Sequence, residues 1–562
     1  GYLHAVQWFP KLGVFEDIDG EVQWNCEPYH YLSEFYSDFA TYDVTLTLPK
    51  HYEGQIVTTG TLSDPEFKVD KVIYKSTTEG ENPVHDFAFT VDPNALVYKR
   101  TFNAQNFEFR DKGEELKVAL SLGLPAEENK ILPENEVEMI LMLQPEHSEY
   151  KERYFDATAK ALYYFGLWYG NYPYKTISIV DPANNARNTG GMEYPRLFTG
   201  GVRLGMAERT LRPQGVTVHE FGHQYWYGIV ASDEFRHAWI DEGFTTFDTN
   251  RILDAAWEPA LATYDLLGKQ YYGQAPLSLV EYGEGDIRSN FSLQRLEVPK
   301  NKFIPKISFS LRDKTSLSSF LQELPVFTYY PRVEKSATLG LRSSYEYDWG
   351  QPLCHFTYDL FHNDLRRVNA YRRPALMLQM IKRSVGDEVF IRLMRDYYES
   401  FRFKHPRPHD FFKVVSKHAS GSSINWPRFW RHAYEENHEL DYAAHHLKNN
   451  SREGGRYFVE FGVRRLGTFV MPVEIEISFE DGTTVIHEWN GEESAYQVDL
   501  GLFDSPAVRL DVDPQRKLML DRNWLNNSLV SKESSGANHA WHIGLRTMYW
   551  AQQILHYFGG AG

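Results

Sequence analysis

Two histidines stand four residues apart in the segment His219-Glu220-Phe221-Gly222-His223. On an α-helix this spacing places both imidazoles on the same face, where together they can bind one metal ion. Glu220 follows the first histidine directly, so its carboxylate would lie beside an open coordination position and could take a proton from water. The spacing therefore predicts a helix that carries two metal ligands and a general base.

A third ligand is predicted on a second helix, in the segment Trp239-Ile240-Asp241-Glu242-Gly243-Phe244. Eighteen residues separate His223 from Glu242, enough for the first helix to end, for the chain to turn near residues 231–233 and for a new helix to begin. Two histidines and one carboxylate leave a fourth position for water, which is typical of a catalytic zinc ion. We therefore expect a metallopeptidase with one Zn²⁺, in which the metal activates water and Glu220 accepts the proton as that water attacks a carbonyl.

A further motif, Gly190-Gly191-Met192-Glu193-Tyr194, precedes the histidine helix. With the two segments above, it resembles the aminopeptidase N family of gluzincins, which combines G-x-M-E-N, H-E-x-x-H and a glutamate after eighteen further residues. The resemblance extends over most of the chain and implies that Glu193 binds the free α-amino group of a peptide, through a charge-assisted pair. It also implies that Gly190, Gly191 and Met192 lie along the substrate, where glycines allow close backbone approach. Tyr194 departs from the asparagine of the family.

Two more site residues follow from the same resemblance. The family stabilises the oxyanion with a tyrosine in a Y-x-x-G setting, which here matches Tyr347-Asp348-Trp349-Gly350, with Tyr345 as the alternative. A second anchor for the amine comes from a Q-x-E strand, for which Gln7 is the best match although the accompanying glutamate is absent. An endopeptidase therefore stays open as an alternative to an aminopeptidase.

The order of the predicted elements indicates a multidomain α+β protein. Strands with period-two alternation are predicted at 42–49, 87–91 and 137–143, in an N-terminal β-sheet domain over 1–145 whose first strands we expect upstream of Gly1. A thermolysin-like, mainly helical catalytic domain is expected over 146–447, with an insertion near 278–335. A linker at 448–455, a small C-terminal β-sandwich over 456–515 and a helical tail over 530–562 complete the prediction.

The composition and charge of the chain limit the classes of partner that we expect it to bind. A chain of 562 residues with 42% apolar residues supports several packed cores. Its net charge of −17 argues against nucleic acid and is compatible with peptides that carry a free, cationic N-terminus. Cys26 and Cys354 have no metal-ligand spacing, and a disulfide bridge between them stays open.

The apolar tail over 541–558 has too many polar residues to span a membrane. We expect it to dock on the protein itself, with an interfacial membrane helix as the alternative.

Three functions from different classes fit these observations. The first is an aminopeptidase acting on peptides. The second is an epoxide hydrolase of the leukotriene-hydrolase type, which some relatives of this scaffold represent. The third is a non-catalytic protein-binding scaffold, against which the intact set His219, Glu220, His223 and Glu242 counts directly. The resemblance to exported bacterial sequences favours the cell envelope or secretion, and the sequence makes no prediction of the oligomeric state.

Overall fold

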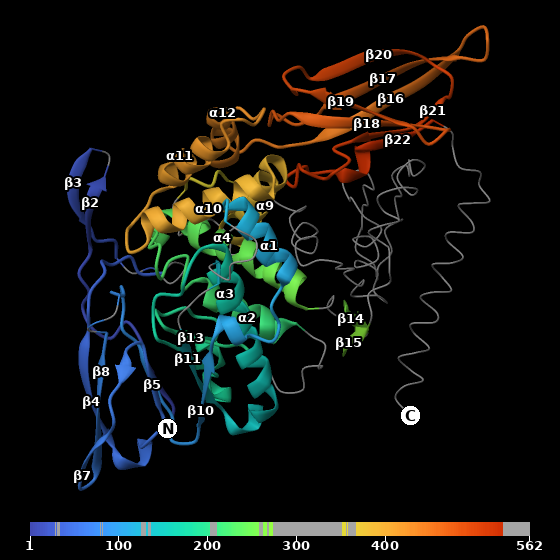
Figure 1. Cartoon of the computed structure of the whole chain (residues 1–562). Coiled ribbons are helices and arrows are strands. Elements are labelled where there is room, and N and C mark those ends of the chain that lie inside the picture. The colour runs from blue at the N-terminus through green and yellow to red at the C-terminus, as the bar shows by residue number, and fades with distance from the viewer. Residues whose placement is uncertain are drawn as a thin grey trace, which may run out of the picture. The chain divides into compact units, whose positions relative to one another are not determined.

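The computed structural model describes residues 1–257, 262–273, 351–357 and 367–531, apart from short gaps at 19, 29, 31–33, 79, 81, 125–130, 133–135, 203–210, 267–268 and 356. The chain forms two compact units (Figure 1). The first unit comprises Gly1–Glu258, Asp348–Ser422 and Tyr434–Glu436, and the second comprises Pro259–Tyr347, Ser423–Ala433 and Asn437–Gly562. Among the described residues, no helix is both long and apolar enough to cross a membrane.

The first unit begins with three small antiparallel sheets. Their strands are β1 (Leu3–Ala5), β2 (Val14–Ile18), β3 (Glu21–Asn25), β4 (Asp43–Pro49), β5 (Ile56–Thr58), β6 (Thr61–Leu62), β7 (Glu66–Lys68), β8 (Lys71–Thr77) and β9 (Phe89–Val91). The sheet orders are β1-β9-β5, β2-β3 and β4-β8-β6, with β7 also paired to β8. Apolar side chains from these strands, among them Leu46, Val72 and Phe89, form one core cluster. The alternation predicted at 42–49 and 87–91 therefore corresponds to β4 and β9.

A mixed sheet follows and carries the segment that leads to the site. Its order is β10-β11-β12-β13, formed by β10 (Leu96–Phe102), β11 (Val137–Leu143), β12 (Thr176–Val180) and β13 (Leu197–Thr199). β10 and β11 are antiparallel, whereas β11, β12 and β13 are parallel. All five residues of β12 are buried, as expected for a strand covered on both faces. The strand predicted at 137–143 is confirmed with the same bounds as β11.

Helices pack around this sheet in the first unit. They are α1 (Lys112–Ser121), α2 (Lys151–Trp168), α3 (Arg212–Gly222), α4 (Glu234–Ala256), the π-helical turn η7 (Arg367–Arg372), α9 (Arg373–Val385), α10 (Asp387–Phe401) and α11 (Pro408–His418). Gly386, with a φ of +85°, lies between the end of α9 and the start of α10. α4 and α9 approach closely because Gly243 lacks a Cβ, which would lie 2.6 Å from the ring of Pro374.

The described residues of the second unit form three antiparallel sheets. Its elements include β14 (Ala262–Leu266), β15 (Lys269–Gly273), α12 (Trp426–Trp430), β16 (Tyr442–Ser451), β17 (Tyr457–Arg465), β18 (Val473–Phe479), β19 (Thr484–Trp489), β20 (Ala495–Phe503), β21 (Ala507–Val512) and β22 (Ser528–Val530). Two sheets have the orders β16-β17-β20 and β19-β18-β21-β22, and the third pairs β14 with β15. Along β18 buried residues alternate with partly exposed ones, which is the pattern of a strand with one face in a core.

The linker predicted at 448–455 is wrong in its first half, because β16 continues to Ser451. The side chain of Asn449 explains the difference. Its amide donates to the carbonyl of Ala507 at 2.8 Å and accepts from the amide of Ala507 at 2.8 Å, as a backbone group would. The chain turns only afterwards, where Gly454 and Gly455 have φ values of +83° and +75°.

The fold class predicted from the sequence is confirmed, with N-terminal sheets, a helical region and C-terminal sheets in that order. The domain boundaries at 145, 447 and 515 remain predictions. The insertion at 278–335 and the tail from residue 532 lie outside the described residues. Cys26 and Cys354 are both exposed free thiols.

Candidate metal centre and active site

The two histidines meet at the end of α3. Pro213 occupies the first turn of this helix, where its missing N–H costs nothing, and the last helical residue is Gly222. His219 lies one turn before the end and His223 caps it in a helical conformation. Their Nε2 atoms lie 3.2 Å apart. The predicted placement of both imidazoles on one helix face is therefore confirmed.

Glu242 completes a triangle of ligand atoms from α4. Its Oε2 lies 3.2 Å from Nε2 of His219 and 3.4 Å from Nε2 of His223. Three corners of a tetrahedron with metal–ligand distances of about 2.0–2.1 Å are separated by about 3.3 Å. The triangle thus has the size that one Zn²⁺ ion requires, and its two nitrogens and one oxygen are zinc donors.

Hydrogen bonds on the far side of each imidazole direct its lone pair toward this triangle. Nδ1 of His223 contacts the buried carboxylate of Asp241, which accepts from the N–H at Nδ1, so Nε2 is the nitrogen turned toward the triangle. Nδ1 of His219 lies 3.4 Å from Oγ1 of Thr249, which itself donates to the carbonyl of Thr245 at 2.7 Å. The Thr249 hydroxyl oxygen can therefore only accept from His219, so both histidines turn Nε2 toward the place where a metal ion would bind.

Replacement of Asp241 tests this orientation without reference to turnover. Asp241→Asn keeps an oxygen that accepts from Nδ1 of His223 but loses the negative charge, so we expect zinc affinity to fall about 10-fold, at the lower end of the range for such partners. Competition with a chromogenic chelator measures the affinity directly. Asp254→Asn, with the same charge change at an exposed position of α4, is the matched control. Equal zinc affinity of the two variants would contradict the role of Asp241.

Glu220 is the buried carboxylate beside the triangle. Its side chain is on the inner face of α3, the residue is only 5% exposed, and Oε2 has no hydrogen-bond partner among the described residues. Burial raises the pKa of Glu220 to about 8, although the neighbouring His223 acts in the opposite direction. A cation bound by the triangle would favour the ionised carboxylate. A buried oxygen without a protein partner, next to three converging metal-ligand atoms, can accept a hydrogen bond from a bound water molecule. A general base needs this property.

The glycine-rich segment 190–194 runs along the edge of the site. Gly191 and Met192 are paired with Thr199, whose carbonyl and hydroxyl accept their N–H groups at 3.0 Å each. Gly191 has a φ of +75°, and a Cβ there would lie 3.6 Å from Oε1 of Glu220. A Cβ at Gly190 would lie 2.5 Å from the carbonyl of Gly200. Both positions therefore require glycine, the first for its backbone conformation and the second for space.

Glu193 reaches from this segment to the general base. It is 5% exposed, and its carboxyl group lies close enough to that of Glu220 for the two to share a hydrogen bond when one of them carries a proton. Burial, reinforced by the charges of Glu34 and Glu220, raises the pKa of Glu193 well above its usual range, and His223 opposes the shift. The two carboxyl groups thus form a pair that a cationic group could bridge in place of the proton.

Tyr371 is a site residue that the sequence analysis missed. It lies in η7, donates a hydrogen bond from its hydroxyl to Oε1 of Glu242, and its ring stacks on that of His219 with centroids 6.0 Å apart. The signal was the segment Tyr371-Arg372-Arg373-Pro374, which differs from Y-x-x-G only in its last residue. Tyr347 and its alternative Tyr345 lie outside the described residues, and Tyr347 stays a prediction.

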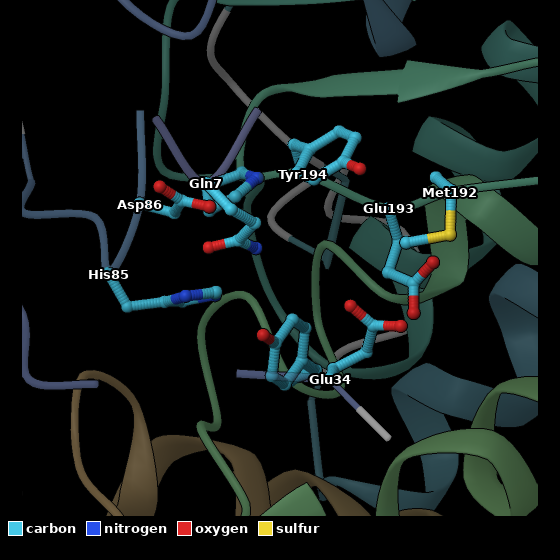
Figure 2. A pocket seen from close by; sticks show the side chains of 9 residues that line it. Gln7, Glu34, His85, Asp86, Met192, Glu193 and Tyr194 are labelled. Carbon is cyan, nitrogen blue, oxygen red and sulfur yellow. The ribbon is translucent and has the colours of Figure 1, made fainter. Parts of the chain in front are cut away.

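Gln7 and Glu193 line the same pocket (Figure 2), and the role of Gln7 as an anchor for the amine stays a prediction. Gln7 follows the end of β1 after one intervening residue, and its φ of +51° is rare for a residue with a side chain. Its carbonyl oxygen accepts a hydrogen bond from Lys11. The carbonyl oxygen of the Gln7 amide is therefore partly engaged within the protein.

The comparisons with known proteins agree at the level of fold. No family model matches the sequence, and no curated protein matches it. Legionella pneumophila aminopeptidase A, solved in complex with aspartic acid, superimposes with a TM-score of 0.50 and 13% identity over 88% of this chain and 45% of that chain. The E323A mutant of the M1 zinc metallopeptidase from Deinococcus radiodurans gives 0.41 and 14%, over 71% of this chain and 65% of that one. The chain spans less than half of the Legionella enzyme, whose fold it shares.

Proposed function

We propose that the chain is a zinc-dependent aminopeptidase that removes N-terminal residues from peptides. One observation carries the proposal. The zinc-sized triangle of His219, His223 and Glu242 lies beside a buried general base, and that base contacts the carboxyl group of Glu193. The first part supports hydrolysis of an acyl bond, and the second supports recognition of a nearby cation.

The hydrolytic step is assigned to residues of this chain. Zinc, when bound, supplies a Lewis acid that makes water more acidic and polarises the scissile carbonyl. The carboxylate of Glu220 accepts the proton of the attacking water and later delivers it to the departing amine. The hydroxyl of Tyr371 lies at the edge of the triangle, and when substrate binds it would turn its one proton from Glu242 to the oxyanion. Gly191 and Met192 would support the substrate backbone alongside Glu220.

The contact between Glu193 and Glu220 favours cleavage after a single residue. The nitrogen of an α-ammonium group lies only about 2.5 Å from the carbonyl carbon of the same residue. A carboxylate that binds this nitrogen must therefore be a neighbour of the base that acts at the carbonyl. An internal peptide nitrogen would offer one N–H and no charge, and would compensate two buried carboxylates poorly.

A pair of chromogenic amides tests the proposal. We expect the aminoacyl p-nitroanilide to be hydrolysed in a zinc-dependent reaction and its N-acetylated form to be hydrolysed at a small fraction of that rate. Hydrolysis of both at the same rate would contradict the aminopeptidase proposal and support an endopeptidase. Metal analysis of the same preparation should give one zinc per chain, whereas a chain without stoichiometric metal would support a non-catalytic scaffold.

A further inference from the structure

We propose that Glu234 positions the metal ligand His223 through Asp241, by donating a hydrogen bond from a neutral carboxyl group to the Asp241 carboxylate. Glu234 is a positioning residue in this scheme, because it acts on the metal centre only through another side chain. The inference rests on the proposed zinc-dependent function and deepens it. Glu234 belongs to none of the motifs that the sequence analysis identified.

Glu234 is a buried acidic residue at the start of α4. It directly follows the N-cap residue Asp233 and is only 1% exposed. Asp241 lies seven residues later in the same helix and is fully buried. Among the described residues, no N–H or hydroxyl group donates to Oε1 of Glu234 or to Oδ2 of Asp241, although both atoms are buried. Buried carboxyl oxygens normally accept a hydrogen bond, so both atoms need an explanation.

The contact between the two side chains supplies that explanation. Their carboxyl groups lie close enough to each other to share a hydrogen bond when one of them carries a proton. Two ionised carboxylates at this separation would repel each other strongly in a buried environment. One of the two groups is therefore neutral, and a neutral carboxyl group is a hydrogen-bond donor.

Glu234 is the partner that carries the proton. Burial, reinforced by the charges of Asp241 and Glu242, raises the pKa of Glu234 well above its usual range. Asp241 instead accepts from Nδ1 of His223, and a hydrogen bond to a carboxylate favours its ionised form. The Asp241 carboxylate then accepts from His223 through Oδ1 and from Glu234 on its other side. It is therefore held at both ends.

A break in α4 accounts for the contact. In a regular helix, residues seven positions apart share a face but are separated by about 10.5 Å along the axis. The backbone of His237, between Glu234 and Asp241, leaves the helical region with φ −139° and ψ +41°. The carbonyl of Glu234 also accepts from the hydroxyl of Thr357 at 2.9 Å, which fixes the first turn from outside the helix. The position of Glu234 is thus determined by the fold around it.

The expected benefit is a fixed orientation of His223. A carboxylate that is held by one hydrogen bond can rotate, and the imidazole that it orients would rotate with it. A second hydrogen bond prevents this rotation. Because Glu234 is neutral, it supplies the bond without adding another negative charge beside Glu242 and Glu220. Outer partners of this kind typically contribute about 10-fold or more to metal affinity.

The test compares the zinc affinity of Glu234→Gln and Glu234→Met, measured by competition with a chromogenic chelator. Glutamine keeps a neutral donor of nearly the same shape, so we expect the affinity of wild type. Methionine has a similar length and no donor, so we expect the affinity to fall about 3-fold to 10-fold, at or just below the lower end of the range for outer partners. Glu152→Met, at an exposed position of α2, is the matched control. Glu234→Ala replaces the methionine variant if that protein does not fold.

A double-mutant cycle distinguishes positioning from a general effect on the fold. If Glu234 acts through Asp241, Glu234→Met should cause little further loss of zinc affinity in an Asp241→Ala background. The same loss in both backgrounds would refute the inference, because Glu234 would then support the site by another route.

Two further results would refute the inference and leave the proposed function intact. Equal losses for Glu234→Gln and Glu234→Met would show that the metal site needs the charge of Glu234 rather than a donated hydrogen bond. Wild-type affinity in Glu234→Met would show that the contact with Asp241 does not matter for the metal. If wild type itself bound no stoichiometric zinc, the proposed zinc-dependent function would fail, and the inference would fail with it.

Discussion

Glu220→Gln is expected to keep one zinc ion per chain and to lose about 1,000-fold or more in kcat on an aminoacyl p-nitroanilide, in the upper part of the range for general acid–base catalysis. The amide cannot accept the proton of the attacking water. It has almost the same shape as the carboxylate, and Glu220 lies outside the triangle of metal ligands, so the metal site should be unaffected. The loss should be severe because Glu220 is buried and is the one residue proposed as the base at this position.

Zinc analysis and steady-state kinetics on the same preparation separate the two effects. Glu152→Gln is the matched control, since it makes the same chemical change at an exposed position of α2. A Glu220→Gln enzyme with activity near that of Glu152→Gln would contradict the assignment of the base. A variant that lost its zinc would instead show that Glu220 supports the metal site.

The convergence of the proposed zinc ligands could be predicted from the sequence because their arrangement depends on local geometry. A spacing of four residues fixes two side chains on one helix face whatever the rest of the protein does. The position of Glu242 needed only a turn and a new helix, and Asp233 caps that helix through a hydrogen bond to the amide of Phe235. The strand over 137–143 was equally local, since the pattern and length of this segment indicate a strand without reference to the rest of the chain.

The other parts of the site depend on contacts between distant segments. Tyr371 and Glu242 are 129 residues apart in sequence, and only the fold brings the hydroxyl of one to the carboxylate of the other. The linker prediction failed for a related reason. Asparagines are typical of loops, but Asn449 takes the hydrogen bonds of a backbone group in β16.

Tyr371 shows how a small departure from a motif hides a site residue. Y-x-x-G pointed to Tyr347, because in the motif that begins at Tyr371 the fourth position is Pro374 instead of glycine. The structure gives a reason for proline there. It occupies the first turn of α9, where a missing N–H is tolerated, and it packs against Gly243 next to the metal ligand Glu242. Tyr371 and Tyr347 are therefore competing candidates for the residue whose hydroxyl donates to the oxyanion.

Tyr371→Phe is expected to lower kcat about 100-fold or more, with little change in KM, because removal of one oxyanion donor has an effect of this size. The hydroxyl of Tyr371 also contacts Glu242, so zinc content must be measured together with kinetics. Unchanged zinc with reduced kcat supports a donor to the oxyanion, whereas weakened zinc binding would show that the phenol only orients the ligand. Tyr347→Phe and Tyr345→Phe are the comparisons. A larger loss of kcat at Tyr347 than at Tyr371 would assign the oxyanion to the tyrosine that the motif indicates, and the contact of Tyr371 with Glu242 would then be structural.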